Sequence, residues 1–166
     1  MSNRKVTGKV WKFGSDINTD LVIPNFAIYL KRKEQPQHCF VANRPGWVNE
    51  VRPGDILIAG TNFGVGSGRP IGDVFVDLGL GAVVAESFNG LGLRNCVNAG
   101  LASLPCRGIL DAFDEGDVAE VDWATGEVRN LTKGTTLTGQ ALPPEIRSII
   151  EVGGVEDMLR SEGFLD

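Results

Sequence analysis

Two short, fully apolar segments flank a glycine-rich stretch in the middle of the chain, and this arrangement constrains the fold most. The segments are Ile56–Ala59 and Ala82–Ala85. Apolar runs of this length are typical of strands buried on both faces of a sheet. Residues 60–72 are rich in glycine, and residues 73–80 have the length of a crossover helix. The order of strand, glycine loop, helix and strand predicts a βαβ unit with a right-handed crossover.

The same pattern continues on both sides of this unit. Residues 4–13 alternate well enough to predict a strand before it, and residues 90–100 and 101–104 predict a second helix and a short strand after it. We therefore expect several neighbouring strands in one sheet.

The last third of the chain has an antiparallel character. Residues 117–123 and 127–131 alternate polar and apolar side chains around a Thr125-Gly126 turn, which predicts a hairpin. Pro143 and Pro144 open a last helix over residues 145–151, and two glycines end it. The predicted fold class is α/β with a mixed parallel and antiparallel sheet. With 166 residues, the chain has the size of a single domain, residues 1–166.

Residues 29–37 read YLKRKEQPQ, and the stretch after them has weak periodicity. We expect a long, mobile surface loop with one helical turn, and such loops are usually functional or disordered. A basic run of Lys31, Arg32 and Lys33 lies within it. The ordinary interpretation is a solvated surface patch, and the alternative is a flap that closes over an anionic ligand.

The charge balance excludes some classes of partner. The chain has 21 acidic and 16 basic residues, a net charge of -5. This balance argues against nonspecific binding to nucleic acid or to an anionic membrane. No stretch approaches the roughly 18 apolar residues of a membrane span, and residues 1–12 lack the apolar run of a signal peptide. We expect a cytoplasmic protein.

Histidine and cysteine are scarce, whereas glycine is abundant with 22 residues. Cys39, Cys96 and Cys106 are unevenly spaced and form no CxxC motif, which disfavours a disulfide framework or a metal cluster on this chain. His38 is the single histidine, and a lone loop histidine is usually a solvated residue. This composition favours chemistry by backbone amides and arginine.

The segment NFGVGSGRP at residues 62–70 is the best candidate for that chemistry. Its glycines allow N–H groups to point at one anion, Arg69 offers a bidentate grip on a carboxylate, and the Ser67 hydroxyl is placed to transfer a proton. The spacing does not fit a Walker A loop, a dinucleotide fingerprint or a hydrolase elbow. The alternative is a loop whose glycines only permit a tight strand-to-helix turn.

Several motifs occur in order over nearly the whole chain. They are VWKFG at 10–14, NTDLVIP at 18–24, YL at 29–30, PGDI at 53–56, NFGVGSGR at 62–69, AESF at 85–88 and RNCVNAGL at 94–101. With these motifs the chain resembles the small subunit of 3-isopropylmalate dehydratase, within the aconitase superfamily. Several motifs in register are far more specific than any single one.

The resemblance implies a swivelling β/β/α domain that pairs with a separate large subunit. That partner would carry a [4Fe-4S] cluster through its own cysteines, so no cofactor or metal is expected on this chain. The implied reaction removes water from a hydroxy-dicarboxylic or tricarboxylic acid and adds it back at the neighbouring carbon. The cluster iron would act as Lewis acid, while this subunit handles the proton on carbon.

The resemblance also implies residue roles in the glycine loop. Ser67 falls on the family's catalytic serine, which takes and returns the proton. Arg69 falls on the arginine that binds a substrate carboxylate. Backbone N–H groups from Gly66 through Gly68 to Arg69 would stabilise the serine anion together with the guanidinium.

Two further segments match residues near the family's active site. Thr19 and Asp20 match a Thr-Asp pair at its edge. Lys31, Arg32 and Lys33 lie where the family varies a loop that helps select the substrate. These five residues complete the predicted substrate-binding set.

The glycine loop departs from the family's usual Gly-Cys-Gly-Ser-Ser-Arg-Glu-His-Ala at Val65, Gly68, Pro70, Ile71 and Gly72. The leading prediction is a small subunit that isomerises 2-isopropylmalate and 3-isopropylmalate in leucine biosynthesis. One alternative is a related hydro-lyase that acts on homoaconitate or a methylated malate. The other is a noncatalytic carboxylate-binding module that retains the loop.

Overall fold

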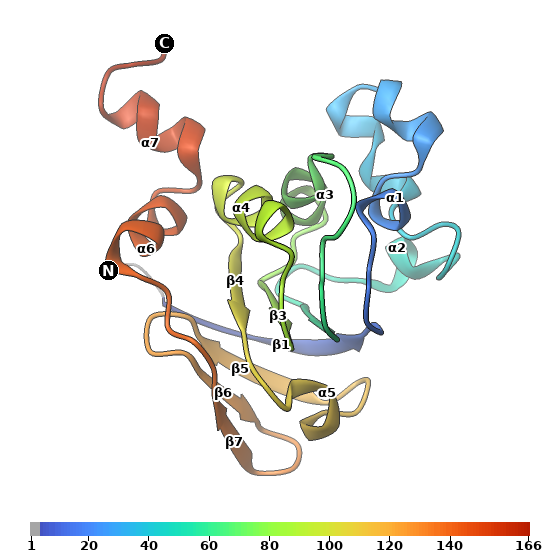
Figure 1. Cartoon of the computed structure of the whole chain (residues 1–166), viewed down its shortest axis with the longest axis vertical. Helices are drawn as coiled ribbons and strands as arrows, with labels where there is room; N and C mark the ends of the chain where they lie inside the picture. The colour runs from blue at the N-terminus through green and yellow to red at the C-terminus, as the bar shows by residue number, and fades with distance from the viewer. Residues whose placement is uncertain (1–3) are drawn as a thin grey trace.

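The computed structural model describes residues 4–166, so the first three residues of the predicted single domain lie outside it. Its strands are β1 Lys5–Lys12, β2 Ile56–Ala59, β3 Ala82–Ala85, β4 Ala102–Pro105, β5 Val118–Asp122, β6 Glu127–Asn130 and β7 Thr135–Thr138. They form one curled sheet with the order β4-β3-β2-β1-β5-β6-β7 (Figure 1). The predicted α/β fold with a mixed sheet is confirmed.

β1 joins the parallel and antiparallel halves of this sheet. Its residues 5–9 pair antiparallel with β5, and residues 10–12 pair parallel with β2. β2, β3 and β4 are parallel neighbours, whereas β5, β6 and β7 form an antiparallel meander. The predicted hairpin of β5 and β6 is therefore correct.

Helices cover both faces of the parallel half. The α-helices are α1 Thr19–Val22, α2 Trp47–Glu50, α3 Ile71–Asp77, α4 Gly90–Asn98, α5 Ile109–Ala112, α6 Pro144–Glu151 and α7 Val155–Ser161. The 3-10 helices are η1 Asn25–Tyr29, η2 Arg32–Glu34 and η3 Pro36–His38. Figure 1 shows α3 and α4 on one side of the parallel strands and α5 on the other. Among residues 4–166, no helix combines the length and apolar character needed to cross a bilayer.

The side chains of β2 explain why its sequence is apolar throughout. Leu57 and Ala59 pack into a cluster that includes Phe75 of α3, whereas Ile56 and Ile58 pack into a second cluster on the opposite face. All four residues of the strand are fully buried. α3 covers one face of this strand, and α5 together with the curled antiparallel half covers the other, so both faces are buried.

The structure corrects the expectation for residues 29–37. Residues 29–38 contain η2 and η3, two short 3-10 helices where one helical turn was predicted. Gln35 is buried and donates from Nε2 to the carbonyl oxygens of Ile28 and Leu30. The segment therefore folds back on itself through a polar side chain, which a periodicity argument does not detect.

Candidate functional site

Two loops meet at the carboxyl end of the parallel strands. One follows β1 and the other follows β2, and these strands are parallel neighbours, so both loops emerge at the same edge of the sheet. Backbone hydrogen bonds join them, from Gly60 N to Gly14 O at 3.0 Å and from Gly64 N to Ile17 O at 2.9 Å. This pairing places the start of α1 against the glycine-rich segment.

Ser67 lies exposed at the apex of the glycine loop, and Thr19 lies buried beneath it. The Ser67 amide donates to Thr19 Oγ1 at 3.1 Å, and the two hydroxyl oxygens are 3.5 Å apart. Arg69 Nε donates to Ser67 Oγ at 3.2 Å. The structure thus brings Thr19, Ser67 and Arg69 together, and a positive charge lies directly beside the serine hydroxyl.

The rest of the Arg69 guanidinium is bonded to the segment that follows Thr19. Its Nη1 donates to the carbonyl oxygen of Ile23, and its Nη2 donates to Asn25 Oδ1. Asp20 Oδ1 lies 3.0 Å from Nη2, and the Arg69 side chain is only 10% exposed. Arg69 therefore fixes the α1–η1 segment against the glycine loop while its Nε faces Ser67.

Two glycines of the loop are needed on steric grounds. Gly66 has a φ of 116°, and a Cβ there would lie 2.4 Å from Asn18 Oδ1. Gly64 has a φ of 80°, and its Cβ would lie 2.7 Å from the Cα of Gly92 in α4. Left-handed backbone and close approach both favour glycine. The steric interpretation of the loop is thus correct for these two positions.

The four amides predicted to face an anion fall into two groups. The Ser67 amide is bonded to Thr19, and the Arg69 amide donates to Ser67 O at 2.9 Å. The amides of Gly66 and Gly68 have no acceptor within residues 4–166, and both residues are exposed. Two amides next to Ser67 are therefore open to a ligand.

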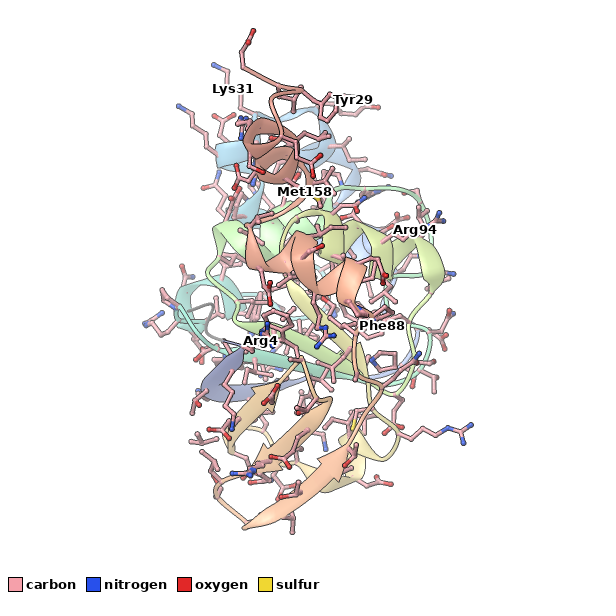
Figure 2. The ribbon with its side chains drawn as sticks, turned by 90° about the vertical axis from the view of Figure 1, so that its left-hand side faces the viewer. Arg4, Tyr29, Lys31, Phe88, Arg94 and Met158 are labelled. Atoms are coloured by element: carbon pink, nitrogen blue, oxygen red, sulfur yellow. The ribbon has the colours of Figure 1, made fainter. Side chains whose placement is uncertain are left out.

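The three residues of the basic run, Lys31 to Lys33, lie in different environments. Arg32 donates from Nε and Nη2 to the two carboxylate oxygens of Asp77 at 3.0 and 3.1 Å, and its Nη2 lies 3.4 Å from Asp73 Oδ1. The hydrogen bond to Asp77 raises the pKa of Arg32. Lys31 and Lys33 are exposed, and Figure 2 shows Lys31 at the upper end of the molecule. Within residues 4–166, no hydrogen bond or ion pair joins this run to Ser67 or Arg69.

The cysteines do not fit an iron–sulfur cluster. Cys39 and Cys96 lie in one core cluster and Cys106 in the other, and all three are buried. Burial raises the pKa of Cys96 to about 12 and that of Cys106 to about 11, whereas cluster ligands are thiolates. Across residues 4–166, no group of three His, Cys, Asp or Glu side chains is placed to hold a metal ion. His38 packs edge-on against Phe26, with 4.9 Å between ring centroids.

Sequence reasoning missed two asparagines of the site. Asn18 Oδ1 accepts from Asp20 N at 2.9 Å and caps α1, and asparagine directly before a helix is a recognisable signal for this role. Asn25 holds the Arg69 guanidinium, and no local pattern marks it. Its contact spans 44 positions and depends on how the segment after α1 folds.

Comparison with known proteins agrees with this architecture. Residues 16–107 match the family model of the aconitase C-terminal domain. The isopropylmalate/citramalate isomerase small subunit of Methanocaldococcus jannaschii is 40% identical over 95% of both chains. The 3-isopropylmalate dehydratase small subunit of Heliobacterium modesticaldum is 40% identical over 93% of this chain and 95% of its own.

A solved structure is similar over the same extent. The crystal structure of 3-isopropylmalate dehydratase from Methanocaldococcus jannaschii superimposes with a TM-score of 0.89 and 29% identity, over 96% of this chain and 95% of that one. Sequence and fold therefore agree over nearly the full length. The chain belongs to the aconitase C-terminal domain family and, within it, to the small subunits of 3-isopropylmalate dehydratase.

Proposed function

We propose that this chain is the small subunit of a cytoplasmic hydro-lyase of leucine biosynthesis that isomerises 2-isopropylmalate and 3-isopropylmalate, with Ser67 as the proton-transfer base. The chain acts as one domain together with a large subunit. The [4Fe-4S] cluster belongs to that partner, because the buried thiols of this chain do not fit it. The observation that carries the proposal is the hydrogen bond from Arg69 Nε to the exposed Ser67 Oγ.

The chemistry assigned to this chain is a proton transfer. Ser67 Oγ takes a proton from the carbon next to the one that bears the hydroxyl group, and a double bond forms between these carbons as hydroxide leaves. In the second step hydroxide adds to the carbon that lost the proton, and Ser67 Oγ returns a proton to the carbon that lost the hydroxyl group. A serine alkoxide is a strong base that needs stabilising, and the Arg69 guanidinium supplies a fixed positive charge at 3.2 Å.

Substrate carboxylates are bound around this base. The open amides of Gly66 and Gly68 receive one, and Arg69 receives another when the exposed Asp20 side chain moves off Nη2. Thr19 holds the Ser67 amide from below. Lys31 and Lys33 attract the anionic substrate from the neighbouring loop, and Arg32 holds this loop on α3.

The test is Ser67→Ala in the complex with the cognate large subunit. Loss of a general base lowers kcat by about 100- to 10,000-fold, and KM changes little because Ser67 does not hold a carboxylate. Ser161→Ala is the matched control, since Ser161 is an exposed serine on α7. An inactive wild-type complex would overturn the activity itself, whereas an active Ser67→Ala complex would overturn only the assigned base.

Citramalate is a second candidate substrate. The relative from Methanocaldococcus jannaschii is named for both isopropylmalate and citramalate. The ratio of kcat/KM for the two acids, measured with the same complex, distinguishes a leucine-pathway enzyme from a broader isomerase.

A further inference from the structure

Two residues with unusual backbone conformations face each other across the paired loops. Asp16 and Asn62 have φ angles of 55° and 57°, and Phe40 is the only other non-glycine residue with positive φ among residues 4–166. Aspartate and asparagine tolerate the left-handed conformation better than most residues. Asn62 Nδ2 donates to Asp16 Oδ1 at 3.0 Å, so the two strained positions are also bonded to each other.

This pair lies where the spacing between the two loops changes. In the strands Lys12 pairs with Ile58, whereas in the loops that follow them Asn18 pairs with Val65. Between these pairs the amide of Asp16 donates to Thr61 O at 2.8 Å. The segment after β2 is thus one residue longer than the segment after β1 between these two pairs. The left-handed turn at Asn62 accommodates the extra residue, much as a bulge does in a strand pair.

From this point to Ser67, regular hydrogen bonds connect the two loops. Gly64 N donates to Ile17 O, Thr19 N donates to Val65 O at 2.8 Å, and Ser67 N donates to Thr19 Oγ1. A shift at the start of this ladder therefore changes which residue stands opposite Thr19 at its end.

The backbone of Asn62 is also hydrogen-bonded to a third segment of the chain. Its amide donates to Ser87 Oγ at 2.9 Å, in the turn between β3 and α4. The backbone of Asn62 is thus anchored to one neighbouring loop while its side chain reaches the other.

We propose that Asp16 and Asn62 form a positioning pair that sets Thr19 against Ser67 and so fixes the proton-transfer geometry. The kinetic consequence rests on the proposed function, whereas the structural consequence is independent of it. Neither residue touches Ser67. Both act through the hydrogen-bonded ladder that ends at the Ser67 amide.

The test exchanges the two side chains, because aspartate and asparagine have nearly the same shape and both tolerate a left-handed backbone. Asn62→Asp places two carboxylates against each other and pushes the loops apart. Adding Asp16→Asn restores one amide and one carboxylate with their places reversed. Asn62→Gly keeps the left-handed backbone and removes only the amide. Asn43→Asp, at an exposed site elsewhere, controls for the added charge.

Two readouts are measured. In the complex with the large subunit, Asn62→Asp and Asn62→Gly lower kcat on the order of 100-fold with KM little changed, as expected for a displacement of about 1 Å. The exchanged double variant recovers most of kcat. In the full chain alone, hydrogen exchange at the Ser67 amide is faster in the two single variants and returns toward wild type in the double variant.

The outcomes separate this inference from the proposed function. If the wild-type complex has no dehydratase activity, the function fails, and exchange at the Ser67 amide alone decides on the positioning pair. Unchanged exchange in folded Asn62→Asp and Asn62→Gly overturns the pair. A double variant as impaired as Asn62→Asp overturns it as well, because restored side-chain bonding then has no effect.

Discussion

Arg69 Nε donates a hydrogen bond to Ser67 Oγ over 3.2 Å, while the other guanidinium nitrogens are bonded to residues 20–25. A single side chain therefore connects the serine to the segment that follows α1. A lysine cannot make this set of bonds, because its ammonium group is a compact point charge without a planar fork.

Arg69→Lys is expected to lower kcat in the assembled enzyme by about 100-fold, the cost typical of losing one donor to a developing oxyanion. KM also rises if the guanidinium binds a substrate carboxylate. Steady-state kinetics measures both constants, with Arg107→Lys as an exposed control. An unchanged kcat would show that the Ser67 hydroxyl does not depend on this arginine.

Asp20→Asn tests whether Asp20 occupies a position that a substrate carboxylate takes. Asp20 Oδ1 lies 3.0 Å from Arg69 Nη2, and the Asp20 side chain is 54% exposed. Because water screens the half-exposed Asp20 carboxylate, the pair contributes about 1 kcal/mol, and neutralising Asp20 should lower KM by about fivefold or less. Substrate titration at constant ionic strength measures this change. A higher KM would mean that Asp20 supports the guanidinium instead of competing for it.

The central strands could be predicted because burial on both faces leaves an apolar run such as Ile56–Ala59. β7 could not be predicted, since its residues TTLT are mostly exposed and only Leu137 packs on the core. α7 was also missed, because the glycines that end α6 conceal a second helix directly after them. Helix or strand formation in these places depends on tertiary contacts more than on local pattern.

The site was predictable to a similar degree. Ser67, Arg69 and Thr19 lie in recognisable motifs, and the fold brings them together. The run of Lys31, Arg32 and Lys33 looks uniform in sequence, yet Arg32 faces α3. Asp73 and Asp77 are four positions apart on this helix, so both carboxylates lie on the face that meets Arg32. The spacing of the two aspartates can be read from the sequence. Their partner Arg32 lies 41 or more positions away, and only the fold identifies it.

Asp77→Asn is expected to loosen the segment that contains η2. The carboxylate of Asp77 receives two hydrogen bonds from Arg32, and its loss should increase local opening by up to about fivefold, the equivalent of about 1 kcal/mol. Limited tryptic cleavage at Lys31 and Lys33 reports this opening when the segment closes faster than it is cut. Asp111→Asn on α5 serves as the control. Equal cleavage rates in Asp77→Asn and Asp111→Asn would show that the ion pair between Arg32 and Asp77 does not hold the segment.

Gly90 and Gly92 lie two positions apart in α4, and alanine should affect them in opposite directions. A Cβ at Gly92 would lie 2.7 Å from the Cα of Gly64, whereas a Cβ at Gly90 would meet nothing within 4 Å. Overpacking against backbone costs about 1–3 kcal/mol, so Gly92→Ala lowers stability. Gly90→Ala raises it by about 0.4–1 kcal/mol, because the unfolded chain loses conformational freedom. Urea unfolding of both variants measures the difference. Similar effects at both sites would contradict the close approach of α4 to the glycine loop.

The thiol of Cys106 predicts a loss of stability at alkaline pH. Burial raises its pKa from 9.0 to about 11, and the nearby Glu86 carboxylate adds to the shift. The folded thiol therefore stays protonated while the thiol of the unfolded chain ionises, so this stabilisation is complete below pH 9 and is lost as pH rises toward 11. The free energy of unfolding is measured by urea titration at about pH 8 and at about pH 10. Its decrease between these two pH values should be larger for wild type than for Cys106→Ala. Equal slopes would show that Cys106 ionises as readily in the folded protein as in the unfolded chain.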